Sequence, residues 1–232
     1  RMEVIWLNLI TNNPKQVVDF ICKQILKILQ EKNYVVLGVP GGRSVKPIFS
    51  EFLKHTEIPW EKIHIFMVDE RLVPVSDTDS NFLLVKKQFV DLLVKKKLLS
   101  EKNLHPFILD NSKKDFGISQ YEKELKKYGG MYDVVILGTG EDCHVAGLFP
   151  EHTIKNNSDF FIHFHNSPKP PKDRMTASRN LIQKSNVGVV IFLGEGKKNA
   201  YENFKNNKIK LNACPTKIVK KIKDYIIYTD LD

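Results

Sequence analysis

An aspartate and a histidine stand two residues apart just after the most apolar stretch of the chain. The run 134–137 is wholly aliphatic, glycines follow at positions 138 and 140, and Asp142 and His144 come next. In an open α/β sheet, ligands bind at the loops that leave the carboxyl ends of the strands, and glycines there let the backbone approach a ligand closely. A histidine at that point can exchange a proton near neutral pH. We therefore expect His144, with Asp142 beside it in the same loop, to be a candidate proton-transfer group.

A glycine-rich turn with one cation follows an earlier apolar run. Gly41, Gly42, Arg43 and Ser44 stand between the run 34–39 and a helical pattern. The N–H groups of such a turn can hold a phosphate at the start of a helix. The alternative is a tight turn in which Ser44 caps the helix. The spacing matches neither the dinucleotide nor the P-loop signature, so both interpretations stay open.

Acids, an arginine and an amide follow a third apolar run. Asp69 and Arg71 come directly after it, and Asn81 stands a short distance further along the chain. Asp69 and Asn81 are suited to binding hydroxyl groups, and the guanidinium of Arg71 is suited to an anion. The alternative is a local ion pair with Ser80 or Asp79 as a helix cap.

Two further cations stand near other turns. Arg174 follows the proline-rich segment 168–171, which we expect to form a stiff loop before a helix, and Lys197 follows a Gly-x-Gly turn. The alternative for both is a solvated basic surface. The chain has only five arginines, however, and Arg43, Arg71 and Arg174 all fall in predicted loops. This placement favours recognition of an oxyanion.

The cysteines indicate the compartment and argue against metal chemistry. The chain has three cysteines, far apart in the sequence, which is typical of reduced thiols in a cytoplasmic protein. No spacing of cysteine, histidine and acidic residues resembles a zinc site, so we expect no metal. Cys143 could act as a nucleophile beside His144, but adjacent side chains point apart. We favour a packing role for Cys143.

The composition excludes several classes of function. The 232 residues carry a net charge of +9, with 42% hydrophobic and 27% charged residues. The lysines are scattered without interleaved aromatic residues, so we expect no nucleic-acid partner. No apolar run approaches the roughly 18–20 residues that span a bilayer, so we expect no membrane association. The positive charge instead favours small anionic substrates.

Apolar runs alternate with helical patterns along the chain. We expect strands at 3–9, 34–39, 63–68, 104–109, 132–137, 160–164, 187–193 and 225–228. We expect helices from Asn13-Pro14 onward and at 45–54, 80–93, 115–127 and 196–206, with a polar loop at 69–79. This alternation predicts an α/β fold with a doubly wound, mostly parallel, Rossmann-like sheet and helices on both faces. We expect residues 1–232 to form a single domain.

Taken in order, these segments resemble the 6-phosphogluconolactonase family, part of the wider glucosamine-6-phosphate deaminase/lactonase superfamily. The resemblance covers essentially the whole chain. Its most specific parts are D-E-R-x-V-P at 69–74 with Ser80-Asn81, and G-x-G-x-D-x-H-x-A-x-L-F-P at 138–150. The run S-P-K-P-P at 167–171 with Arg174 and Thr176, and Lys197 after a late strand, add to them.

The resemblance implies hydrolysis of 6-phospho-D-glucono-1,5-lactone to 6-phosphogluconate, the second step of the pentose phosphate pathway, without a cofactor. Carried over by position, His144 is the general base and Asp142 positions it. The remaining roles are phosphate binding and sugar orientation, implied for Arg71, Arg174, Lys197 and the turn 41–44, and hydroxyl binding or support of the site, implied for Asp69 and Asn81. In some lineages the family is fused to a glucose-6-phosphate dehydrogenase, so fusion or association with that enzyme is a further expectation.

Two departures and two alternatives remain. Family members commonly have glycine in place of Cys143 and serine in place of Gly147. A sugar-phosphate deaminase or isomerase of the same superfamily is one alternative, although Phe-Asn-Glu is usual there where this chain has 148–150 as Leu-Phe-Pro. A non-catalytic sugar-phosphate sensor, which would not need His144, is the other.

Overall fold

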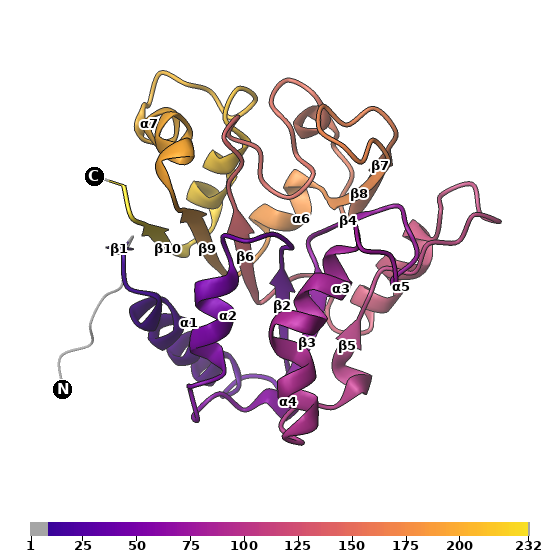
Figure 1. The fold of residues 1–232 in the computed structure, drawn as a ribbon, viewed down its shortest axis with the longest axis vertical. Helices are drawn as coiled ribbons and strands as arrows, with labels where there is room; N and C mark the ends of the chain where they lie inside the picture. The colour runs from indigo at the N-terminus through magenta and orange to yellow at the C-terminus, as the bar shows by residue number, and fades with distance from the viewer. Residues whose placement is uncertain (1–8, 232) are drawn as a thin grey trace.

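A parallel sheet of seven strands forms the centre of the molecule in the computed structural model, which describes residues 9–231 (Figure 1). Its order is β1-β10-β9-β6-β2-β3-β5, and all neighbouring strands are parallel. The strands are β1 (Leu9–Thr11), β2 (Val35–Val39), β3 (Ile63–Met67), β5 (Leu104–His105), β6 (Val134–Gly138), β9 (Val187–Phe192) and β10 (Asp224–Thr229). The predicted fold class is confirmed.

Helices cover both faces of this sheet (Figure 1). One face carries α1 (Pro14–Ile28), α2 (Lys46–Phe52), α3 (Asn81–Val85) and α4 (Asp91–Lys95), and the other carries α5 (Ile118–Lys126), α6 (Arg179–Gln183) and α7 (Lys198–Lys205). Successive strand residues point to opposite faces, so in β6 Val134 and Ile136 pack under the first group and Val135 and Leu137 under the second. No helix in the described part of the chain is both long and apolar enough to cross a membrane.

The start of α1 follows its sequence signals. Asn13 accepts a hydrogen bond from the Lys15 N–H, and Pro14 occupies the first helical turn. The first N–H groups of a helix have no partner within the helix. Asn13 accepts a hydrogen bond from one of them, and Pro14 has no N–H to leave unpaired. Of the strand predicted at 3–9, all but the last residue lies outside the described residues. The strand predicted at 104–109 is wrong beyond His105.

The helix predicted at 80–93 is interrupted. It begins as expected, with the Ser80 hydroxyl accepting from the Leu83 N–H, but a π-helical turn over Lys86–Val90 separates α3 from α4. The apolar residues Phe82, Val85, Phe89 and Leu93 keep the spacing of a regular helix and are all buried, so the sequence pattern does not reveal the wider turn.

A second, smaller sheet was not predicted from the sequence. Its order is β4-β8-β7, with antiparallel pairs between β4 (Asp69–Arg71), β8 (Arg174–Ala177) and β7 (Phe161–Phe164). The predicted loop at 69–79 and the predicted loop position of Arg174 are therefore wrong at β4 and β8. Three and four residues with mixed polarity give no strand periodicity, and pairing with a distant segment supplies the missing stability. The strand predicted at 160–164 is confirmed as β7, over Phe161–Phe164.

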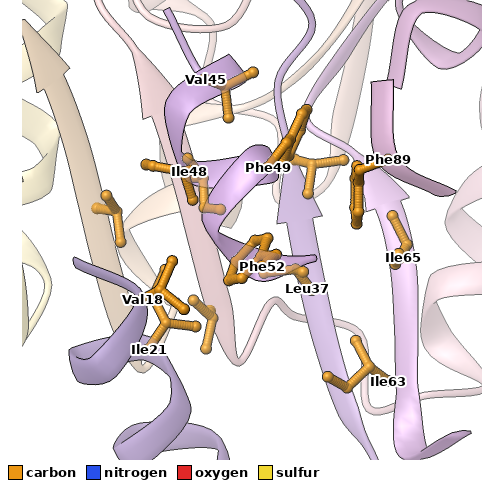
Figure 2. Packing of buried hydrophobic residues seen from close by; sticks show 14 of the residues in the cluster. Val18, Ile21, Leu37, Val45, Ile48, Phe49, Phe52, Ile63, Ile65 and Phe89 are labelled. Carbon is orange, nitrogen blue, oxygen red and sulfur yellow. The ribbon is translucent and has the colours of Figure 1, made fainter. Parts of the chain in front are cut away.

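Aliphatic side chains and a group of aromatic rings fill the core between the sheet and its first helical face (Figure 2). Phe49 of α2 stacks on Phe89 with ring centroids 4.3 Å apart, and Phe52 and Trp60 meet edge to face nearby. Phe89 is completely buried. These contacts fix α2 against β2 and β3, and α2 starts directly beside the turn 41–44.

Phe89→Ala tests the weight of this packing. Removing a fully buried ring leaves a cavity in a core that relaxes only partly, so we expect the free energy of unfolding to fall by roughly 3–5 kcal/mol. Urea denaturation measures the change, with Leu92→Ala as the matched control because Leu92 is on the same segment and 45% exposed. Similar losses in both variants would contradict the assigned core.

Candidate functional site

The side on which successive strands are added to the parallel sheet changes between β2 and β6. From β2 the sheet grows through β3 to β5 on one side, and from β6 it grows through β9 to β10 on the other. The loops that leave β2 and β6 therefore diverge, which is the arrangement that opens a binding crevice at the carboxyl ends of the strands. A cleft of about 770 Å³ lies there.

All but one of the predicted site residues line this cleft. They are Gly41, Gly42, Arg43, Ser44, Asp69, Arg71, Asn81, His144, Arg174 and Lys197. Asp142 is absent from the lining but contacts His144 from behind. Sequence reasoning did not single out as site residues several further lining residues, which include Thr139, Glu141, Ala146, Lys169 and Leu193.

The imidazole of His144 is held by a carboxylate and by a close turn. Its Nδ1 lies 2.5 Å from Oδ1 of Asp142, and its ring packs against Phe149 with centroids 4.6 Å apart. A Cβ at Gly140 would overlap the ring and the Asp142 carboxylate. Glycine is thus required at position 140 for the pair to occupy its place.

Asp142 is ionised in this arrangement. Burial alone would raise its pKa, but the hydrogen bond from His144 and the charges of His144 and Lys169 lower the pKa well below its ordinary value. The Lys169 Nζ lies 3.4 Å from Oδ1 of Asp142. An anionic Asp142 keeps the proton of His144 on Nδ1 and leaves Nε2 as the acceptor.

Cys143 does not face the cleft. Its sulfur lies 3.7 Å from Nδ2 of Asn203 and 3.8 Å from the Ala200 carbonyl oxygen. A hydrogen bond with the thiol of Cys214 lowers the pKa of Cys143, but the side chain is buried away from the lining residues. The packing role expected for it is favoured over a nucleophilic one. Its φ of 70° is left-handed backbone, the conformation for which glycine is best suited.

Gly147, the other departure from the family pattern, has no room for a side chain. A Cβ there would come within 2.7 Å of the Thr176 Cβ. The Gly147 N–H instead donates to the Thr176 hydroxyl at 2.8 Å. In this chain, Thr176 of β8 therefore supplies a hydroxyl beside position 147.

Two arginines from distant segments meet across the small sheet. Arg71 of β4 and Arg174 of β8 are direct antiparallel partners. Asp69, on the same face of β4 as Arg71, has an oxygen 4.0 Å from Nη1 of Arg174. Burial raises the pKa of Asp69, although both arginines act in the opposite direction. The three side chains form a mixed-charge wall of the cleft.

The guanidinium groups of Arg71 and Arg174 differ in how many of their hydrogen-bond donors are used within the protein. Arg174 is almost fully buried and donates to the carbonyls of Lys169, Pro170 and Pro171. These bonds hold the 169–171 loop in place and occupy most of its donors. Arg71 commits one donor, Nη1, to the Asp79 carbonyl at 2.5 Å, and its Nε is buried without a hydrogen-bond partner among the described residues. Arg71 therefore keeps more donor capacity for an anion.

Glu70 organises the wall from the other face of β4. One carboxylate oxygen accepts from the N–H groups of Arg71 and Asn81 at 2.8 and 2.7 Å, and the other accepts from the Phe82 N–H at 2.8 Å and the Ser80 hydroxyl at 3.0 Å. Burial raises its pKa, and the backbone donors oppose that rise. Sequence reasoning gave Glu70 no separate role, yet strand alternation would have turned it away from Asp69 and Arg71.

Asn81 connects this wall to the glycine-rich turn. Its Nδ2 donates to the Asp69 carbonyl at 3.1 Å, and a Cβ at Gly41 would overlap its amide. The turn therefore needs glycine at position 41 for close approach. Ser44 does not cap α2, whose cap position is Val45 and has no side-chain hydrogen bond. The alternative of a Ser44-capped turn is wrong.

Five cations surround the cleft against two lining carboxyl groups. The cations are Arg43, Arg71, Lys169, Arg174 and Lys197, and the carboxyl groups are Asp69 and Glu141. Burial lowers the pKa of Lys197, and the neighbouring Glu141 acts in the opposite direction. Within residues 9–231, the cleft holds no group of three clustered metal-ligating side chains. The arrangement suits an anionic ligand beside a histidine that can accept a proton.

Known proteins resemble this chain along nearly its whole length. The family model described as glucosamine-6-phosphate isomerases/6-phosphogluconolactonase matches residues 12–228. A protein of Borreliella burgdorferi named 6-phosphogluconolactonase is 31% identical over 204 residues, which are 88% of this chain and 86% of the relative. A Dictyostelium discoideum protein named probable 6-phosphogluconolactonase is 28% identical over 224 residues, 92% of each chain. The crystal structure of 6-phosphogluconolactonase from Thermotoga maritima superposes with a TM-score of 0.80 at 24% identity, covering 97% of this chain and all of that one.

Glu70→Gln tests the buried carboxylate. The substitution replaces one carboxylate oxygen, which accepts two hydrogen bonds, with an amide nitrogen that can only donate. Two buried donors then lose their acceptor, so we expect the free energy of unfolding to fall by about 1–3 kcal/mol. Urea denaturation at neutral pH provides the measurement. Glu202→Gln is the control, because Glu202 is an exposed carboxylate paired with Lys205, and we expect a change within about 0.5 kcal/mol. A Glu70→Gln variant as stable as the control would rule out this role.

Proposed function

The chain belongs to the glucosamine-6-phosphate isomerase/6-phosphogluconolactonase family, and on this premise we propose that it hydrolyses 6-phospho-D-glucono-1,5-lactone to 6-phosphogluconate with His144 as the general base. One observation carries the assignment of the base. The His144 ring lines a cleft rich in cations, and the ionised Asp142 holds its Nδ1 at 2.5 Å. A phosphorylated lactone needs both an anion anchor and a group that activates water.

The lactonase branch of the family is favoured over the deaminase branch. Both curated relatives described above carry lactonase names. In this chain Leu148 and Phe149 are buried apolar residues, and the Phe149 ring packs on His144. The segment 148–150 thus brings no further carboxylate to the cleft, where a deaminase usually has one.

Water activation falls to Nε2 of His144. With the Nδ1 proton held by Asp142, the Nε2 lone pair accepts a proton from water as its oxygen attacks the lactone carbonyl. The imidazolium that forms is stabilised by the Asp142 carboxylate. Its proton then passes to the ring oxygen as the bond from the carbonyl carbon to that oxygen breaks. The new carboxylic acid releases its remaining proton to solvent, so the products are a carboxylate, a free hydroxyl and one proton, and no cofactor takes part.

The cations divide between anchoring and charge stabilisation. We assign phosphate binding to Arg71, Lys197 and the turn 41–44. Arg71 keeps donors that are not used within the protein, and Lys197 follows β9, on the other side of the cleft from Arg71. Arg174 acts mainly by holding the 169–171 loop, which presents Lys169 to the cleft. Asp69 and Asn81 bind sugar hydroxyls or support the wall. Positive charge near the carbonyl stabilises the oxyanion of the tetrahedral intermediate.

The cellular setting is part of the proposal. Cys22, Cys143 and Cys214 are all free thiols, which favours a reducing compartment such as the cytoplasm. The substrate is the product of sugar-phosphate oxidation at the first carbon. Fusion or association with a glucose-6-phosphate dehydrogenase would deliver it directly to this cleft.

His144→Ala tests the general base. Loss of general-base catalysis typically lowers the rate by about 10²–10⁴-fold, so we expect the turnover of freshly generated lactone to fall by that factor while 6-phosphogluconate still binds. Coupling to 6-phosphogluconate dehydrogenase follows the reaction, with spontaneous ring opening subtracted. His165→Ala is the matched control, because His165 also contacts an aspartate, Asp173 at 2.8 Å, but lies outside the cleft. Unchanged turnover in His144→Ala would reject it as the base.

Lys197→Ala and Arg71→Ala test the phosphate anchor. Losing one charged hydrogen bond of about 1.5–3 kcal/mol weakens binding by roughly 10- to 150-fold. We expect calorimetry to show this loss for 6-phosphogluconate and little change for gluconate. Lys198→Ala and Arg179→Ala are the controls, because both residues are charged and absent from the cleft lining. Equal weakening for both ligands would place the two cations elsewhere on the substrate.

A further inference from the structure

Three metal-ligating side chains that the proposed reaction does not use meet outside the cleft. Cys22 lies on α1, and His55 and Glu57 lie in the segment that follows α2. One donor atom of each, a thiol sulfur, an imidazole nitrogen and a carboxylate oxygen, lie within 4.8 Å of one another. Within residues 9–231 this is the one such group of three or more. None of its members lines the cleft.

The exposure of the three side chains increases from the interior of the protein to its surface. Cys22 is 3% exposed and packs in the core cluster of the first helical face. The side chain of His55 is 14% exposed, and Glu57 is exposed. An ion from solvent therefore meets the carboxylate first, and the thiol closes the inner side of the group.

The imidazole of His55 already has one nitrogen engaged and one left over. Its Nε2 lies 3.2 Å from Oδ1 of Asp19, a carboxylate that also pairs with Lys15. Its Nδ1 is buried and has no hydrogen-bond partner among the described residues. Buried polar atoms are nearly always paired, so an unpaired one calls for a specific reason. The Asp19 bond holds the ring proton on Nε2 and leaves a free lone pair on Nδ1.

This is the arrangement that metal-binding histidines use. Their second nitrogen almost always donates to a carboxylate, backbone carbonyl or water, which fixes the tautomer and orients the ring. Asp19 and Cys22 are three residues apart on α1 and so share one face of the helix. The same helical face therefore supplies the outer carboxylate and the inner thiol.

We propose that Cys22, His55 and Glu57 bind a divalent transition-metal ion, with Zn²⁺ as the best match and Asp19 as the outer carboxylate behind His55. Thiolate, imidazole and carboxylate are the ligands that Zn²⁺ takes in proteins. Binding releases the thiol proton to solvent. Three protein ligands leave a fourth position for water.

The geometry needs only a small closure. Zinc bonds of about 2.0–2.3 Å place tetrahedral donors roughly 3.3–3.8 Å apart. The donors here lie within 4.8 Å, and the exposed Glu57 can adjust its rotamer without disturbing the core. The ion then links α1 to the chain after α2, so it acts on the stability of the fold. No local spacing indicates this site, because β2 and α2 separate Cys22 from His55.

Cobalt titration of the metal-free full chain tests the proposal. Co²⁺ replaces Zn²⁺ with the same ligands and gives a thiolate-to-metal charge-transfer band only where a cysteine binds it. We expect one equivalent to produce this band and Zn²⁺ to displace it. Cys22→Ser abolishes the band and His55→Ala weakens Co²⁺ binding, whereas Cys214→Ser, which removes another buried thiol, leaves both intact.

Two further measurements separate a metal site from general packing. Asp19→Asn keeps the charge-transfer band but lowers the affinity for Co²⁺ by about 10- to 100-fold, as expected for an outer carboxylate. Zn²⁺ at 100 times its Kd raises the Tm of the wild-type protein by about 5–10 °C. Cys22→Ser abolishes this rise.

Three results would overturn the proposal. The first is the absence of a charge-transfer band in the folded wild-type protein. The second is a band of equal strength in Cys22→Ser, which would place the thiolate ligand elsewhere. The third is a rise in Tm with Zn²⁺ that Cys22→Ser retains. The first result is read in the wild-type protein alone, so the proposal can be overturned even where a variant does not fold.

Discussion

The reversal of strand order between β2 and β6 is the constraint on which the site depends. Parallel strands require crossovers, and the connections that follow β2 and β6 lead to opposite sides of the strand order, so the space between their loops stays uncovered. The glycine-rich turn and the loop that carries His144 face each other there. Their relative position is set by the register of β2 and β6, which are buried except at Gly138, so the rigid sheet also fixes the polar groups.

The small sheet adds charge to that frame at an energetic cost. Three of its ionisable side chains are almost fully buried: Asp69, Glu70 and Arg174. A buried charge is tolerated only when neighbouring groups compensate it. Glu70 accepts four hydrogen bonds, and Arg174 donates to the carbonyls of the 169–171 loop. Asp69 lies near the charges of Arg71 and Arg174. Each group therefore depends on the others, and the cationic wall is one interdependent unit.

Much of this architecture follows from local signals in the sequence. The aliphatic runs of β2, β6 and β9, the Asn13 and Ser80 caps and the glycines before His144 predicted the sheet, two helix starts and the site loop. The rule that ligands bind at strand ends then placed nearly every predicted residue in the cleft. Pairing between distant segments was not predictable, since the facing positions of Arg71 and Arg174 depend on the register of two very short strands. The side chain of Arg174 in β8 holds the loop that carries Lys169, so the position of Lys169 follows from the same pairing. The helical period also gave no indication of the π turn over Lys86–Val90.

The left-handed backbone at Cys143 has a consequence for the order in which the protein matures. A non-glycine residue holds this conformation only when its surroundings impose it. Here the Cys143 carbonyl accepts from both the N–H and the hydroxyl of Thr216, and the sulfur rests beside Ala200 and Asn203 of α7. All of these partners are synthesised well after His144. On the ribosome, the backbone conformation at Cys143 therefore gains these supporting contacts only once the C-terminal segment has emerged.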